Sequence, residues 1–211
     1  GITTITSGTL ALSGSGSIGT SSGLLNAATF DISATTSGAT ITTLSGAGSV
    51  VLGTKTLTLS AANDTFAGVI SGTGGLVLSS GTQTLTGTNT YTGGTTINGG
   101  TLSFGANDVL SNTGAVNVSG GTLAIGVFSD TVGAVTLSSG SITGTTGGVL
   151  TGASYDVTNA TGTTTIGAIL GGSSGLTKTG AGSLVMSGMN QYMGITTITS
   201  GTLALSGSGS I

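Results

Sequence analysis

The sequence predicts an all-β protein built as a parallel β-solenoid, also called a β-helix, with about 20 residues in each coil. Three observations predict this fold. Short stretches alternate apolar and polar residues, the stretches recur at an interval of one coil, and small residues form corners between them. Period-two alternation is typical of strands with one buried face. Helical spacing is not sustained anywhere, and 43 glycines among 211 residues disfavour helices.

The 20-residue period is clearest at one apolar position. The segment "AVNVSGGTLAIG" at 115–126 aligns with "AVTLSSGSITGT" at 134–145, and an apolar position within them continues in both directions. Each member follows the previous one after one coil. Because the coils of a solenoid stack at about 4.8 Å, these residues are predicted to form one interior column. Its members are Leu59, Leu78, Ile97, Val118, Leu137 and Val157.

Small polar corners follow the members of this column. They read "SSG" at 79–81, "NGG" at 98–100, "SGG" at 119–121 and "SSG" at 138–140. Glycine suits such corners because it adopts positive φ without a Cβ clash. Ser, Thr and Asn side chains are expected to hydrogen-bond the backbone of neighbouring coils. Coil boundaries within 19–56 are not predicted, because the period is less regular there.

The first 18 residues, 1–18, occur a second time as 194–211 and are identical at every position. The chain is therefore interpreted as one full solenoid unit, 1–193, followed by the start of the next tandem copy, 194–211. At about 20 residues per coil, the unit corresponds to about ten coils, or roughly 45–48 Å of rise. Because this is nearly a whole number of coils, a new copy is expected to enter in phase. Strand pairing is then expected to run unbroken across residues 193 and 194.

The composition excludes several classes of function. Thr, Ser and Gly supply 44, 30 and 43 residues, and the chain contains no Cys, His, Arg, Glu, Pro or Trp. Without Cys or His there is no ordinary ligand set for zinc, haem or an iron–sulfur cluster, so no cofactor is expected. Two lysines and no arginine argue against nucleic-acid binding. No apolar run reaches the roughly 18 residues of a membrane helix.

The five aspartates are the candidates for catalysis, because some β-helices cleave polysaccharides. Glycosidases need two carboxyl groups about 5–10 Å apart. Asp108 and Asp130 are separated by about one coil and could stack, while Asp156 lies more than one coil further on. The pattern favours turn aspartates, since "AND" at 106–108 and "FSD" at 128–130 lie between expected strands. With neither Arg nor His as a partner, the chain is expected not to be an enzyme.

Two binding functions have weaker support in the sequence. The solenoid calcium motif, which recurs about every nine residues, is absent, so the isolated Asp and Asn residues fit turns better than cation sites. An ice-binding face needs the same Thr motif in every coil, whereas the aligned outward positions are Ser103, Ala124 and Thr143. The two lysines, Lys55 and Lys178, are expected to keep exposed edges soluble.

Two segments carry a family resemblance. The segment "GLTKTGAGSLVMSGMNQYMGITTITSGTL" at 175–203 resembles the passenger-associated transport repeat, also called the autotransporter-associated β-strand repeat. A more diverged copy, "GLVLSSGTQTLTGTNTYTGGTTINGGTL" at 75–102, lacks the "TKTGAG" opening. The resemblance implies a right-handed β-helix in a secreted or surface-exposed bacterial protein, with no catalytic residues. The repeat-motif positions shared by both copies include Asn89 with Asn190 and Tyr91 with Tyr192.

These observations favour a structural function. The chain is expected to be a repeat unit of a secreted bacterial surface protein that stacks end to end into an extracellular fibre or stalk. The expected partners are copies of itself, either separate or in one tandem polypeptide, and further candidates are lateral fibre contacts and host surface glycans. The alternative is an adhesin or autotransporter passenger whose shaft presents a binding site. Either function places the chain outside the cell or on its surface.

Overall fold

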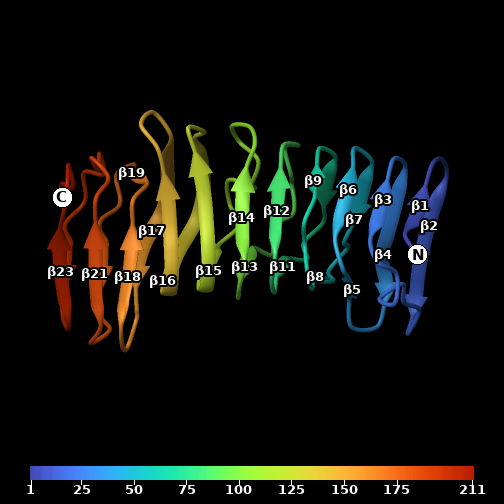
Figure 1. Cartoon of the computed structure of the whole chain (residues 1–211), viewed down its shortest axis with the longest axis horizontal. Coiled ribbons are helices and arrows are strands. Elements are labelled where there is room, and N and C mark those ends of the chain that lie inside the picture. Colours follow the sequence, from blue (N-terminus) through green and yellow to red (C-terminus); the bar gives the residue numbers. More distant parts are fainter.

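The structure, a computed structural model, describes all 211 residues and contains 23 strands and no helix. Every strand pairing is parallel. The coils stand side by side in sequence order along the long axis, and the two termini lie at opposite ends (Figure 1). The predicted all-β solenoid with coils of about 20 residues is therefore confirmed.

The strands lie on three faces, which the chain visits in the order face 2, face 1, face 3, although some coils pass a face without a strand. Face 1 contains β1 (Thr3–Ile5), β3 (Leu24–Asn26), β6 (Leu44–Gly46), β9 (Thr65–Phe66), β12 (Thr82–Leu85), β14 (Thr101–Phe104), the ends of β15 (Val116–Gly126) and β16 (Asp130–Gly144), β18 (Thr163–Ile166), β21 (Ser183–Met186) and β23 (Thr202–Leu205). Face 2 contains β5 (Ala39–Ile41), β8 (Leu57–Leu59), β11 (Leu76–Leu78), β13 (Thr95–Ile97), the first part of β15, the middle of β16, the end of β17 (Val149–Val157), β20 (Leu176–Lys178) and β22 (Thr196–Ile198). Face 3 contains β2 (Thr9–Gly14), β4 (Thr29–Thr35), β7 (Ser49–Val51), β10 (Val69–Ser71), the starts of β16 and β17, and β19 (Ile169–Gly171).

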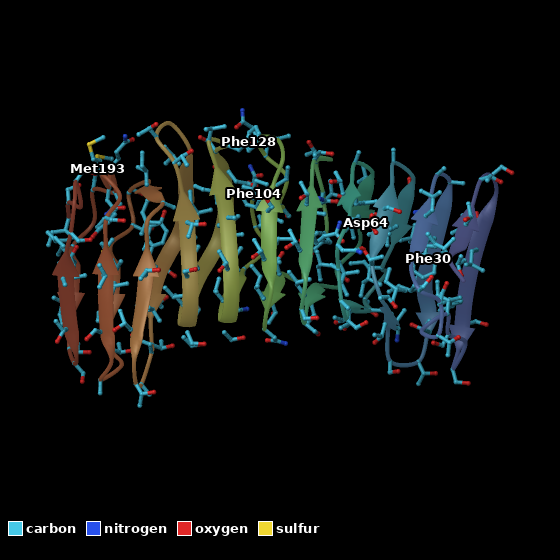
Figure 2. All side chains as sticks on the ribbon, viewed as in Figure 1. Phe30, Asp64, Phe104, Phe128 and Met193 are labelled. Atoms are coloured by element: carbon cyan, nitrogen blue, oxygen red, sulfur yellow. The ribbon has the colours of Figure 1, made fainter.

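One hydrophobic core of 41 buried residues runs through the stack. The core follows from the alternation in the sequence, because the first and third residues of short strands such as β11 are buried while the second is only half-buried. Phe30 and Phe104 lie within the stack, whereas Met193 projects from its edge and is 82% exposed (Figure 2). A fully buried Leu or Phe side chain contributes about 1.5–3 kcal/mol relative to an exposed one.

The two copies of the 18-residue sequence lie on different faces. Thr3–Ile5 pairs with Leu24–Asn26 on face 1, whereas the identical Thr196–Ile198 pairs with Leu176–Lys178 on face 2. Nine coil-to-coil steps along face 1 lead from β1 to β21, and the chain then passes face 3 before β22 on face 2. The 193-residue period thus covers nine coils and two thirds of a tenth. The expectation that a second copy enters in phase is wrong, because the unit does not hold a whole number of coils.

Backbone pairing continues on both sides of residues 193 and 194. Met193 N donates to Gly172 O at 2.9 Å, and Thr196 pairs with Leu176 shortly afterwards. The second copy therefore forms a coil against the preceding one, with β22 on β20 and β23 on β21.

Candidate functional site

The candidate site consists of buried contacts that hold neighbouring coils together. The predicted apolar column lies on face 2, where each member pairs with the next one along the stack. Each of its side chains is at most 1% exposed. The residues of this column are Leu59, Leu78, Ile97, Val118, Leu137 and Val157.

Lys178 extends the same column. It pairs with Val157 on one side and with Ile198 on the other, and its side chain is fully buried. Its Nζ donates to Gly180 O at the adjacent corner, and burial lowers the pKa of Lys178. The expectation that Lys178 keeps an edge soluble is wrong, because residue 178 follows Val157 after one coil and takes the same inward direction. Extension of the column by one more coil beyond Val157 would have predicted that residue 178 is buried.

Asn89 joins three consecutive coils at the corner that leads onto face 3. Its Oδ1 accepts from Ile70 N at 2.7 Å in the preceding coil, and its Nδ2 donates to Gly87 O at 3.0 Å and to Val109 O at 2.7 Å in the following coil. One amide thus satisfies buried backbone groups that the corner leaves unpaired. Asn190 makes the same three bonds with Leu170 N at 2.9 Å, Gly188 O at 3.1 Å and Ser210 O at 2.7 Å.

Tyr91 and Tyr192, two residues after these asparagines, also make matching contacts. Each hydroxyl lies beside a Thr hydroxyl four residues on, at 2.6 Å from Thr95 Oγ1 and 2.7 Å from Thr196 Oγ1. Both rings are buried in the core, and burial raises the pKa of Tyr91. The same set of Asn and Tyr contacts therefore occurs at two corners, one with Asn89 and Tyr91 and the other with Asn190 and Tyr192.

Tyr155 is a third buried tyrosine, and the sequence pattern gave it no role. Its hydroxyl accepts from Gly152 N at 2.6 Å and lies 2.7 Å from Leu150 O and 2.8 Å from Gly171 O, to which it can donate. Its ring lies 6.1 Å from that of Tyr192, at a 44° tilt. Burial raises the pKa of Tyr155, so the group is a neutral phenol that holds a bend in β17. No sequence signal marks this role, because it depends on the bend by which β17 passes from face 3 to face 2.

Replacement of Tyr155 by phenylalanine is expected to destabilise the solenoid by about 1–3 kcal/mol, because Gly152 N and two carbonyls lose their buried partner. The matched control is Tyr192→Phe, whose hydroxyl contacts only the Thr196 side chain and should cost less. Urea unfolding of both variants measures the difference. Equal losses would show that the Tyr155 hydroxyl has no special role.

Asp130 occupies the position that Asn89 and Asn190 take in other coils. Its Oδ2 accepts from Leu110 N at 2.8 Å in the preceding coil, but its Oδ1 is buried without a partner. In the asparagines the corresponding atom is the Nδ2 donor. Asp130 is 2% exposed at the start of β16, so its classification as a simple turn aspartate is wrong. The spacing of two coils from Asn89 was the sequence signal that could have identified its place.

The pKa of Asp130 is raised to about 6: burial is the largest cause, the carboxylate of Asp108 on the preceding coil acts in the same direction, and the Leu110 N–H opposes both. Tyr91, two coils before Asp130, and Tyr155, on the following coil, are neutral phenols with raised pKa values. A protonated Asp130 has an O–H that can donate as the asparagine amide does, whereas in the ionised form the buried Oδ1 carries negative charge with no hydrogen-bond partner.

The unfolding free energy is therefore expected to depend on pH through Asp130. The folded-state pKa lies above the unfolded value of 3.8, so the contribution is fully present below about pH 4 and is lost as the pH rises through about 6. Asp130→Asn should raise stability at pH 7.5 and flatten the change between pH 4 and 7. Asp156→Asn, which removes the same charge from a partly exposed site, is the control. Denaturant midpoints across this range measure the effect, and an unaltered profile in Asp130→Asn would contradict it.

The remaining four aspartates lie in different parts of the solenoid. Asp108 lies in a turn and is the one non-glycine residue with positive φ, at 52°. Asp31 accepts from Ser33 N at 2.8 Å, Asp64 from Thr43 Oγ1 at 2.8 Å, and Asp156 from Ser154 Oγ at 2.9 Å. No three aspartates gather in one place. The carboxylates of Asp31 and Asp156 thus make local contacts, that of Asp64 joins two coils, and Asp108 and Asp130 are coupled electrostatically.

Comparison with protein families gives matches to the passenger-associated-transport-repeat at residues 78–104, 105–125 and 176–205. The chain carries passenger-associated-transport-repeats. The family resemblance of the sequence is therefore confirmed, and a third match covers the segment between 105 and 125. The comparison with curated proteins gave no match, and the comparison with solved structures gave none either.

The passenger-associated-transport-repeats that the sequence aligned lie in phase with each other. Their opening strands, β11 and β20, both lie on face 2 and are five coil steps apart. Asn89 and Tyr91 fall in the first match and Asn190 and Tyr192 in the third, whereas Asp130 falls outside all three. No helix that could span a membrane is present in the structure.

Proposed function

We propose that this chain is a structural repeat unit of a secreted bacterial surface protein, and that such units stack end to end into an extracellular fibre or stalk. Cohesion along the axis comes from parallel backbone pairing between coils, from the apolar columns and from the Asn corners. The family supports a repeat of an autotransporter passenger domain as the setting. Low charge, with two lysines and five aspartates, leaves little repulsion between neighbouring shafts.

The single observation that carries this proposal is the behaviour of the repeated 18-residue sequence. One copy pairs with the coil that follows it, through β1 with β3 and β2 with β4. The identical copy pairs with the coil that precedes it, through β22 with β20 and β23 with β21. The same peptide is thus competent to pair on both of its edges, which is what a coil at a joint between two units must do.

Exposure of apolar side chains supports the same conclusion. In the second copy Ile198 and Leu205 are 49% and 47% exposed, whereas their counterparts Ile5 and Leu12, covered by a following coil, are 6% and 7% exposed. Another coil stacked on β22 and β23 would bury Ile198 and Leu205 in the same way. Removal of this apolar surface from water favours continuation of the stack.

We propose further that the chain catalyses no reaction. This proposal is supported by the structural hydrogen bonds that Asp31, Asp64 and Asp156 make and by the lack of Arg and His. An activity screen on plant and bacterial polysaccharides tests it, and turnover of any of them by the unmodified chain would overturn the proposal. Loss of that turnover in Asp108→Asn and Asp130→Asn would assign it to these carboxyl groups, and its survival would assign it to other residues.

Electron microscopy of the native protein tests the structural function. We expect long filaments with an axial feature at roughly 46 Å, the rise of one unit at about 4.8 Å per coil. Isolated short rods would contradict fibre formation. A glycan array is the complementary measurement, because strong binding to one glycan class by such rods would favour the alternative function, an adhesin passenger.

A further inference from the structure

The repeats inside one unit return to the same face of the solenoid, whereas the sequence repeated between units moves to a different face. The two aligned passenger-associated-transport-repeats lie five whole coils apart, so Asn89 and Asn190 occupy the same corner. The two copies of the 18-residue sequence are one unit apart and differ by one face. An advance of one unit along the chain therefore rotates a segment about the solenoid axis, whereas an advance from one passenger-associated-transport-repeat to the other does not.

The rotation involves the whole 18-residue segment. Thr9–Leu12 lies on face 3 in β2 and pairs with β4, whereas the identical Thr202–Leu205 lies on face 1 in β23 and pairs with β21. The preceding strand moves in the same sense, from face 1 to face 2. Each strand of the second copy thus occupies the face that the chain visits just before the face used by the first copy.

Two corner glycines of the segment have nearly the same φ in both settings. Gly8 and its counterpart Gly201 have φ values of 73° and 76°, and Gly14 and Gly207 have φ values of 55° and 58°. Corner glycines with equal dihedrals give equal changes of direction, so the segment fits either pair of faces without a new conformation. The same sequence therefore fits two different pairs of faces, faces 1 and 3 in the first copy and faces 2 and 1 in the second.

From these observations we infer that in a tandem array each unit is rotated by one face about the solenoid axis relative to the unit before it, so that the array repeats only after three units. Nine and two thirds coils per unit give 29 coils in three units. At about 4.8 Å per coil the true axial repeat is then about 140 Å, three times the spacing of about 46 Å between units. This inference rests on the proposed function, since it needs units joined in one stack.

The rotation determines what the shaft presents to its surroundings. A surface feature such as the exposed Met193 or the projecting loop between β16 and β17 (Figure 1) recurs on each of the three sides in turn. Over three units, each side of the shaft therefore presents the same set of residues. Neighbouring shafts can therefore meet through any side, and a partner that binds one feature finds it at intervals of about 140 Å along a given side.

A chain of four complete units with one cysteine in each tests the inference. The chain has no cysteine, so Thr146→Cys in the exposed loop between β16 and β17 gives one labelling site per unit. Gold-maleimide labels are then located by cryo-electron microscopy. If Thr146→Cys does not fold, Thr161→Cys, in another exposed turn, provides the second labelling site.

The expected result is a straight rod with labels about 46 Å apart along the axis, on three different sides in units one to three. The label of unit four returns to the side of unit one and serves as the internal control. A straight rod with all four labels on one side would overturn the rotation and leave the proposed function in place. Four separate short rods joined at random angles would overturn the proposed function itself.

Discussion

Replacement of Gly100 by alanine is expected to destabilise the solenoid by about 3 kcal/mol or more, which is enough to prevent folding of a marginal unit. Gly100 has a φ of 72° at the corner between β13 and β14, and a Cβ there would clash with Gly81 O and lie 2.6 Å from Gly81 N of the preceding coil. Two neighbouring coils are thus in direct backbone contact at this corner. Relief of the clash would require the coils to separate and their pairing to weaken.

The matched control is Gly162→Ala. Gly162 has a φ of 67°, close to that of Gly100, but no atom lies within 4 Å of its Cβ position. Its cost is the left-handed backbone alone, about 1 kcal/mol. Urea unfolding of both variants separates the dihedral cost from the coil-to-coil clash. Similar losses for the two would show that the corners are not in close contact.

Truncation of Leu137 to alanine is expected to cost about 2–5 kcal/mol. Leu137 is 1% exposed and pairs with Val118 on one side and Val157 on the other, so its removal leaves a cavity between three coils of the face 2 column. The backbone pairing on both sides limits collapse of the neighbouring coils into that cavity. The loss should therefore be near the upper end of the range for buried leucines.

Leu205→Ala is the control for position along the stack. Leu205 pairs with Met186 on face 1 but is 47% exposed, because no coil covers it on the other side. Its truncation should cost less than about 1.5 kcal/mol in the present chain. Denaturant midpoints compare the two variants, and a larger loss for Leu205→Ala would contradict the account of the core.

The sequence predicted the inner part of the stack well because two periods reinforce each other there. Alternation places side chains inside or outside, and the interval of about 20 residues places Leu78 beside Ile97 without further information. Asn89 and Tyr91 could be singled out because a second copy, five coils later, carries them as well. Their hydrogen-bond partners could not, because those partners are backbone atoms of other coils.

Three features could not be predicted from general rules about residue types. Lys178 and Asp130 are charged residues in a chain with few charges, and the usual preference of charged residues for the surface placed both outside. Position along the period outweighs that preference, since the backbone of Lys178 pairs within the face 2 column whatever its side chain. The rotation between units could not be predicted because paired residues on face 2 are 19 to 21 residues apart, and with this spread a length of 193 residues does not distinguish nine and two thirds coils from ten.

Segment 19–56 shows why the period is harder to follow near the start of the chain. Leu24 pairs with Leu44, whereas Ala39 pairs with Leu57, so the interval between paired residues shortens within this segment. The pairing of β2 with β4 contains a register shift between Ala11 and Ser13. Insertions and deletions at corners change the interval without changing the faces, so boundaries in this segment require the structure.

Hydrogen exchange at the joint tests the central claim, that units continue one another as an unbroken stack of coils. The measurement compares the amides of β22 and β23 in the present chain with the same amides in a chain of two complete units. Exchange of these amides should slow in the two-unit chain to the rate of an interior coil such as β11 and β12, because a following coil now pairs with their free edge. Unchanged fast exchange in the two-unit chain would contradict the account.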